Sequence, residues 1–175
     1  MDHAIKDAIK RTAETFRTEP PKAQVTFCSE SALQEGFRSR ARLRSHELII
    51  DEPTGIGGTD QGPTPVELIL AALGACQEIT YRAFATALGI PLEGVSVTVE
   101  GDIDFRGFFA IDPNVRPGFQ ALRVDVRLDS AASQAEIDRL IEMVNSHCPV
   151  LDMLSKPVPA SLATTVNAST KSHGE

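Results

Sequence analysis

The chain has 175 residues, of which 42% are hydrophobic, with a formal net charge of −7 and three cysteines. This length suits one main domain with a sizeable core, and the acidic balance argues against nucleic acid or an anionic membrane as a partner. No apolar run reaches the length that spans a bilayer, and the first residues do not resemble a signal peptide. We therefore expect a cytoplasmic protein whose thiols stay reduced.

The N-terminal segment predicts an amphipathic helix over residues 3–17, which ends at Pro20-Pro21. We expect a helical extension at 1–20, a main domain at 21–168 and a flexible tail at 169–175. Strand-like runs follow the extension, and a loop with four glycines then precedes the next helix. The runs cover residues 23–29, 37–44 and 46–51, and the loop covers 53–63.

The clearest helix in the sequence is predicted at residues 65–88. Thr64 is its N-cap, Pro65 suits the first helical position, Glu67 completes a capping box, and Gly89 is a stop signal. At 1.5 Å per residue this helix is about 36 Å long. Its surface is mostly apolar as far as Gln77, which predicts a central and largely buried helix.

The second half of the chain alternates between strand and helix signals. Strands are predicted at 95–105 and 121–128, and a helix with its own capping box starts after Ser133. Pro149 opens a short helix to about Ser155, and residues 161–166 are a candidate last strand. Strands clustered around helices, rather than strictly alternating with them, indicate an α+β fold.

Two cysteines are the main candidates for chemistry. Cys76 lies in mid-helix on an apolar face, where a thiol is more often a core residue and needs a nearby cation to become a nucleophile. Cys148 directly precedes Pro149, so it either caps the short helix or ends the apolar stripe of the preceding one. A capping position predicts the easier thiolate, because backbone N–H groups stabilise negative charge there. Cys28 has no acidifying neighbour, and we interpret it as structural or incidental.

Two motifs carry a family resemblance. Residues 62–76 (GPTPVELILAALGAC) resemble the first cysteine motif of the OsmC/Ohr family, and His147-Cys148-Pro149-Val150 resembles the second. The resemblance implies an OsmC-like α+β fold, with antiparallel sheets wrapped around long central helices in an intertwined homodimer. It also implies active sites built from both subunits.

The resemblance further implies a thiol-dependent peroxidase that defends against oxidative stress by reducing organic hydroperoxides. In that pattern Cys76 attacks the peroxide and becomes a sulfenic acid, and Cys148 resolves it as a disulfide. A dithiol reductant such as a lipoyl protein then restores the thiols. No cofactor is expected.

The sequence departs from the peroxidase pattern at two places. Peroxidase branches carry a glutamate ten residues before the first cysteine, where this chain has Val66. Glu67 is the remaining candidate, although nine residues place it half a turn away from Cys76, where a capping role also explains it. For the arginine that acidifies the thiol, Arg38 and Arg40 are the candidates nearest the hairpin, and the alternative is a solvated strand face. The chain is thus closer to a less-characterised branch of the family.

A non-catalytic alternative is an OsmC-like protein that binds a small molecule or lipid in the stress response. Its apolar cleft would be lined by Phe105, Phe108, Phe109 and Phe119, or these residues would simply pack on the sheet. A metal site is not expected, because His46, His147 and Cys148 lack characteristic spacing. The chain also has no nucleophile elbow of a Ser/His/Asp hydrolase.

Overall fold

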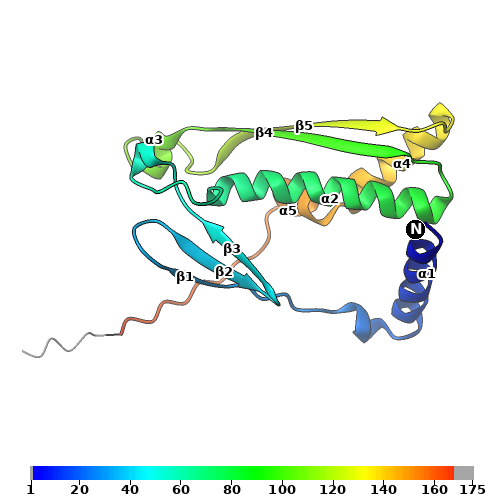
Figure 1. Cartoon of the computed structure of the whole chain (residues 1–175), viewed down its shortest axis with the longest axis horizontal. Helices are drawn as coiled ribbons and strands as arrows, with labels where there is room; N and C mark the ends of the chain where they lie inside the picture. The colour runs from blue at the N-terminus through cyan, green and yellow to red at the C-terminus, as the bar shows by residue number, and fades with distance from the viewer. Residues whose placement is uncertain (1, 168–175) are drawn as a thin grey trace, which may run out of the picture.

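The computed structural model describes residues 2–167, so the tail expected at 169–175 lies outside the described part of the chain. The architecture is α+β, as predicted (Figure 1). Its helices are α1 (Asp2–Thr18), η1 (Pro20–Ala23), η2 (Thr54–Ile56), α2 (Pro65–Leu88), α3 (Phe105–Phe108), α4 (Gln134–His147) and α5 (Pro149–Ser155). Its strands are β1 (Glu30–Leu33), β2 (Ser39–Leu43), β3 (His46–Ile50), β4 (Gly94–Ile103) and β5 (Phe119–Asp129).

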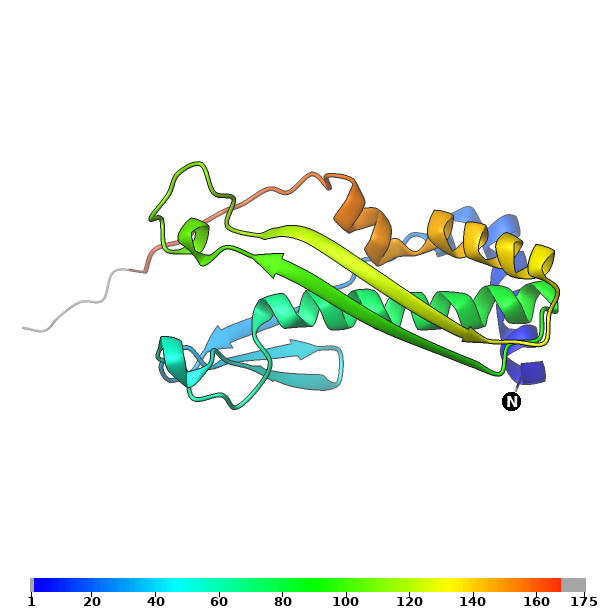
Figure 2. The same ribbon diagram turned by 90° about the horizontal axis from the view of Figure 1, so that it is seen from above.

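Helix α2 is the central element, and its predicted signals are confirmed. The Thr64 hydroxyl accepts from the backbone N–H of Glu67, and the Glu67 carboxylate accepts from the backbone N–H of Thr64. Gly89 ends the helix with a φ of 73°, a left-handed conformation that glycine adopts without strain. The antiparallel β4–β5 hairpin runs along one side of α2, and α4 and α5 lie along another (Figures 1 and 2).

The core lies where α2, α4 and the start of β4 meet. Leu140 and Val144 of α4 are fully buried and pack with Tyr81 and Ala85 of α2. Ile90 of the following connection joins the same cluster. This packing fixes α4 against the second half of α2. It thereby sets the position of Cys148 and α5, which follow α4 directly.

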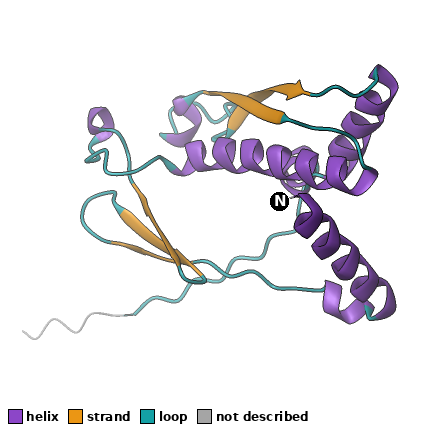
Figure 3. Ribbon diagram, turned by 45° about the vertical axis from the view of Figure 1, so that its right-hand side comes forward, coloured by secondary structure: helices purple, strands orange, loops and turns teal. Residues whose placement is uncertain are grey.

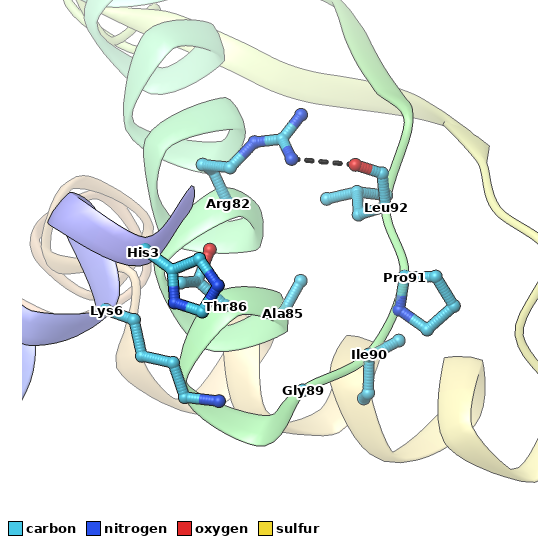
Figure 4. A pocket seen from close by; sticks show the side chains of 9 residues that line it. All are labelled: His3, Lys6, Arg82, Ala85, Thr86, Gly89, Ile90, Pro91 and Leu92. Atoms are coloured by element: carbon cyan, nitrogen blue, oxygen red, sulfur yellow. Dashed lines mark hydrogen bonds between the residues drawn. The ribbon is translucent and has the colours of Figure 1, made fainter. Parts of the chain in front are cut away.

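The N-terminal extension packs against the C-terminal end of α2. Figure 4 shows His3 and Lys6 of α1 beside the last turns of α2, around a small open cavity. Helix α2 has no basic residue in its own last turn, so Lys6 places a positive charge near the negative end of its dipole. Arg82 holds the following connection, because its guanidinium donates to the carbonyl oxygen of Leu92 at 2.7 Å.

Strands β1, β2 and β3 form a separate antiparallel sheet that stands away from the helices (Figure 3). Buried Asp51 organises the loop that returns from this sheet to α2. Its carboxylate accepts from the Thr59 hydroxyl and from the backbone N–H groups of Thr59, Glu52 and Gln61. These hydrogen bonds, the Thr59 hydroxyl first, lower the pKa of Asp51 and keep the carboxylate charged.

Two strand predictions are wrong. Residues 24–29 are extended but pair with no strand, and β1 begins only at Glu30. Residues 161–166 are likewise extended without a strand neighbour in the described part of the chain. Apolar alternation fits an extended backbone, but a strand also needs a partner for its N–H and C=O groups. Both segments leave large apolar side chains open: Phe27 is 85% exposed and Leu162 is 98% exposed.

Candidate functional site

The structure brings Cys76 and Cys148 into contact. Their Sγ atoms lie 3.2 Å apart, and both residues are free thiols. Cys76 projects from the middle of α2, and Cys148 is at once the C-cap of α4 and the N-cap of α5. The two cysteines that carried the sequence motifs therefore form one site within a single chain.

The corner between α4 and α5 sets the position of Cys148. Its backbone N–H donates to the carbonyl oxygen of Val144 at 2.9 Å, which closes the last turn of α4. Pro149 then occupies the first position of α5, where its missing N–H costs nothing. Because Val144 is buried against α2, the corner holds the Cys148 side chain against the middle of that helix.

The two thiols differ in exposure, and burial affects the acidity of Cys148. Cys148 is 1% exposed, whereas Cys76 is only partly buried. Burial is the main cause that raises the pKa of Cys148, and the neighbouring Cys76 adds to it. The backbone N–H groups of Leu151 and Val150, in the first turn of α5, lower the pKa of Cys148 but do not cancel this rise. The expectation that the capping position acidifies Cys148 is therefore wrong, because burial outweighs it and raises the pKa.

Arg40 lies on β2 of the separate three-stranded sheet, and Arg38 lies in the turn between β1 and β2. The Arg38 guanidinium is 3.6 Å from the Glu35 carboxylate, and that of Arg40 is 3.3 Å from Glu47. No ion pair or hydrogen bond joins either arginine to Cys76 within residues 2–167. Within this one chain, the structure does not bring the candidate arginines to the thiol pair.

The Glu67 carboxylate is occupied at the start of α2. It accepts from the Thr64 backbone N–H at 2.7 Å and from the Thr64 hydroxyl at 2.9 Å. These two hydrogen bonds lower the pKa of Glu67. No contact joins it to either thiol in the described part of the chain. In this conformation its interactions are those of a helix cap.

An apolar cavity of about 510 Å³ lies between the first half of α2, β5 and α5. Val66, Ile69 and Leu73 line it from α2, and Leu151 and Leu154 line it from α5. Of the four phenylalanines expected in a cleft, only Phe119 lines this cavity. The others, Phe105, Phe108 and Phe109, pack on one another at the tip of the hairpin, with ring centroids 5.0–6.5 Å apart.

Residues 2–167 contain neither a metal-binding cluster nor a helix that could span a membrane. No group of three or more His, Cys, Asp or Glu side chains is gathered as a metal-binding cluster. None of the helices in this range has both the length and the apolar character needed to cross a membrane.

Comparison with known proteins decides the family. The family model described as OsmC-like protein matches residues 58–163, which is more than half of the chain. The chain belongs to the OsmC-like family. This match contains both cysteines of the OsmC-like site and starts after the N-terminal helix and the three-stranded sheet. No curated protein matches the sequence.

Solved structures share the OsmC-like fold. An OsmC-like protein from Mycoplasma pneumoniae has a TM-score of 0.65 and 20% identity, covering 75% of this chain and 89% of that one. An organic hydroperoxide resistance protein OsmC from Legionella pneumophila has a TM-score of 0.57 and 21% identity, covering 74% and 89%. An organic hydroperoxide resistance protein from Elizabethkingia anophelis has a TM-score of 0.54 and 20% identity, covering 74% and 87%. At these identities the likeness concerns the fold alone.

Proposed function

We propose that this OsmC-like protein is a thiol-dependent peroxidase that reduces organic hydroperoxides, in defence against oxidative stress in the cytoplasm. The observation that carries the proposal is the 3.2 Å separation of the Cys76 and Cys148 sulfur atoms. A thiol pair at this distance can pass between the reduced state and a disulfide without rearrangement of the fold, because a disulfide needs about 2.05 Å between its sulfurs. The names of the hydroperoxide resistance proteins from Legionella and Elizabethkingia agree with this chemistry.

The unequal burial of the thiols supports one order for their reactions. Cys76 is the more accessible sulfur, so it attacks the hydroperoxide as a thiolate. An S–O bond forms, the O–O bond breaks, and the leaving alkoxide takes a proton to become an alcohol. Cys76 is then a sulfenic acid, and the hydroperoxide has been reduced by two electrons.

Cys148 completes the cycle as the resolving thiol. Its sulfur attacks the sulfenic sulfur of Cys76, an S–S bond forms, and water leaves with the thiol proton. Backbone N–H groups of Leu151 and Val150 stabilise negative charge that develops on the Cys148 sulfur during this step. A dithiol such as a reduced lipoyl group restores both thiols by exchange and is itself oxidised to a disulfide.

The attacking thiol needs a cation, and we propose that a second copy of the chain supplies it. Arg38, in the β1–β2 turn, and Arg40, on β2, belong to a hairpin that makes no ion pair or hydrogen bond with the thiols of its own chain within residues 2–167. Large apolar side chains lie open on this isolated chain: Phe27 is 85% exposed and Leu162 98% exposed in the extended segments, and Ile79 is exposed on α2. Apolar surface of this kind favours a homodimer, in which one chain's sheet can cover the other's site.

The proposal is tested by following hydroperoxide consumption with a reduced lipoyl protein as electron donor. Sustained turnover of cumene hydroperoxide by the parent protein and by a Cys28→Ser variant is expected, because Cys28 is an exposed free thiol in an unpaired segment and has no part in the proposed reaction. Cys76→Ser should reduce the rate to that of buffer. Equal rates for parent and Cys76→Ser would exclude the proposed chemistry.

A non-catalytic role in binding a small molecule or lipid is the second candidate. The observation that favours it is the mainly apolar cavity of about 510 Å³ between α2, β5 and α5, which is of the size of small-molecule sites. Unchanged binding of an apolar ligand by a Cys76→Ser/Cys148→Ser variant, together with no turnover by the parent, would favour this function over the first.

A further inference from the structure

A second cavity, of about 290 Å³, adjoins the apolar one and has a different character. Its walls come from α2, β5, α4 and α5, and it shares Val124 and Leu151 with the larger cavity. Most of its lining is aliphatic, but Gln77, Tyr81 and Asn145 bring an amide, a phenol and a second amide to it. No charged side chain among the described residues lines this cavity.

The polar ends of Gln77 and Tyr81 have no protein partner. The two residues are 2% and 3% exposed, yet no hydrogen bond joins the Gln77 amide or the Tyr81 hydroxyl to another group within residues 2–167. Burial is the only cause that raises the pKa of Tyr81, which is consistent with a phenol that lacks a hydrogen-bond partner. Neither polar end is fully sealed from solvent, because no completely buried side-chain atom in this range lacks a partner.

Such groups can pair with an occupant that forms hydrogen bonds. Because neither polar end is sealed from solvent, a water molecule or a ligand that enters the cavity can reach it. Gln77 offers both a donor and an acceptor, and Tyr81 stays protonated and can donate because its pKa is raised. With aliphatic walls and no charge, the cavity suits an uncharged organic molecule that carries an oxygen function.

The cavity is built on the two segments of the chain that carry the thiols. Gln77 directly follows Cys76 on α2, and Leu151, which lines both cavities, comes three residues after Cys148 at the start of α5. An occupant of this cavity would therefore contact the segments of α2 and α5 that carry the thiols, with the larger cavity available for the rest of its carbon skeleton.

We propose that this cavity is the specificity pocket of the protein, in which Gln77 and Tyr81 hydrogen-bond the oxygen of an uncharged organic ligand. The proposal rests on the proposed function for the identity of the natural occupant, which is then the hydroperoxide and its alcohol product. The two residues act as positioning groups and do not exchange protons or electrons with the substrate.

The test compares two probes of nearly the same shape in the Cys76→Ser/Cys148→Ser full-length protein. The first is 2-phenyl-2-propanol, the alcohol product of cumene hydroperoxide, and the second is tert-butylbenzene, in which a methyl group replaces the hydroxyl. Binding is followed by NMR through the methyl groups of Val124 and Leu151. Tyr81 is the only tyrosine in the chain, so its ring signals give an unambiguous second reporter.

The measured quantity is the ratio of the two affinities in the parent and in variants that remove one hydrogen-bonding group. Gln77→Met and Tyr81→Phe keep the side-chain volume close to that of the parent. Each is expected to lower the preference for the alcohol by about 5- to 10-fold, the usual effect of one hydrogen bond. Ser146→Ala, on α4 next to Asn145 and outside the lining, is the matched control and should leave the ratio unchanged.

Three results would contradict the proposal that this cavity is the specificity pocket. They are no shift of the Val124, Leu151 or Tyr81 signals with either probe, an unchanged ratio in both pocket variants, or an equal loss in the Ser146→Ala control. The first two would mean that water alone occupies the cavity. Because this assay uses an inert probe and no cysteine pair, it can fail while peroxide turnover is intact. Equally, it can succeed when turnover is absent, so the two proposals are tested separately.

Discussion

The sulfur atoms of Cys76 and Cys148 lie 3.2 Å apart although 72 residues separate them in the chain. The contact depends on α4, whose buried Leu140 and Val144 anchor it to α2 and so deliver the α4–α5 corner to the middle of that helix. The thiol pair is therefore part of the core architecture rather than of a loose surface loop.

Removing the resolving thiol should trap the first intermediate. In Cys148→Ser, a single equivalent of cumene hydroperoxide is expected to leave Cys76 as a persistent sulfenic acid, because no neighbouring thiol can condense with it. Labelling with dimedone and mass spectrometry of the Cys76 peptide measures this species. In the Cys76→Ser variant Cys148 should remain unoxidised, and dimedone labelling of Cys148 there would reverse the proposed order of the thiols.

Alkylation should distinguish the two thiols. In a Cys28→Ser background at pH 8, iodoacetamide is expected to modify Cys76 at least about tenfold faster than Cys148, since burial raises the pKa of Cys148 and blocks access. Peptide mapping over time gives both rates. Equal rates in the folded protein would contradict the assigned roles.

The same shift in pKa has a consequence for stability. A thiol whose pKa is raised by folding contributes its full stability below the pKa of the unfolded thiol. That contribution is lost as pH rises through the folded value. Between pH 8 and 10 the parent should therefore lose more stability than Cys148→Ser, as measured by urea unfolding monitored by circular dichroism.

The capping box of α2 should matter for stability more than for chemistry. Thr64→Ala is expected to lower the free energy of unfolding by about 1 kcal/mol, because it leaves a backbone N–H of the first turn without a partner. Ser133→Ala, which removes the matching cap of α4, is the control for the size of this effect. Urea unfolding measures both.

Glu67→Gln tests whether Glu67 has a role beyond the cap. The lowered pKa of Glu67 means that its contribution to stability is present above the ordinary pKa of a glutamate and is lost as pH falls through the folded value. We expect the variant to lose this acid-dependent part of its stability and to keep its peroxidase rate. A fall in rate larger than that of Thr64→Ala would instead indicate action at the thiol.

Arg38 is the better candidate to acidify Cys76 from a second copy. Its side chain is 33% exposed and its ion pair with Glu35 is loose, whereas Arg40 and Arg42 both contact Glu47 at 3.3 Å. Arg38→Ala is expected to slow alkylation of Cys76 at pH 7 by about tenfold, the effect of one pKa unit. Arg42→Ala is the matched control. A monomer in sedimentation equilibrium, with Arg38→Ala reacting like the parent, would refute this role.

The sequence predicted the parts of the fold whose signals are local. The capping boxes at Thr64 and Ser133, the proline starts and Gly89 placed α2, α4 and α5 well, since each signal acts within one turn of helix. The extended segments at 24–29 and 161–166 were misjudged, because whether an extended segment becomes a strand depends on a neighbour far away in the chain.

The residues of the candidate site could be predicted from the sequence, but the burial that sets the acidity of Cys148 could not. The motifs identified Cys76 and Cys148, yet burial of Cys148 arises from packing of α4 and α5 on α2, which no local pattern reveals. Gln77 was noticed only as the end of an apolar surface. The sequence did contain one signal for it: Gln77 is a polar residue next to Cys76 on a helix that was expected to be buried. A buried amide needs a hydrogen-bond partner, so it indicates a polar contact or a ligand.

The most direct test of the account is the redox state of the pair after one equivalent of cumene hydroperoxide. Non-reducing peptide mapping by mass spectrometry should find the Cys76 and Cys148 peptides joined by a disulfide within one chain, with Cys28 still free. Recovery of both thiols unmodified, or of oxidised Cys76 beside a free Cys148, would contradict the central claim that these two residues act as a redox pair.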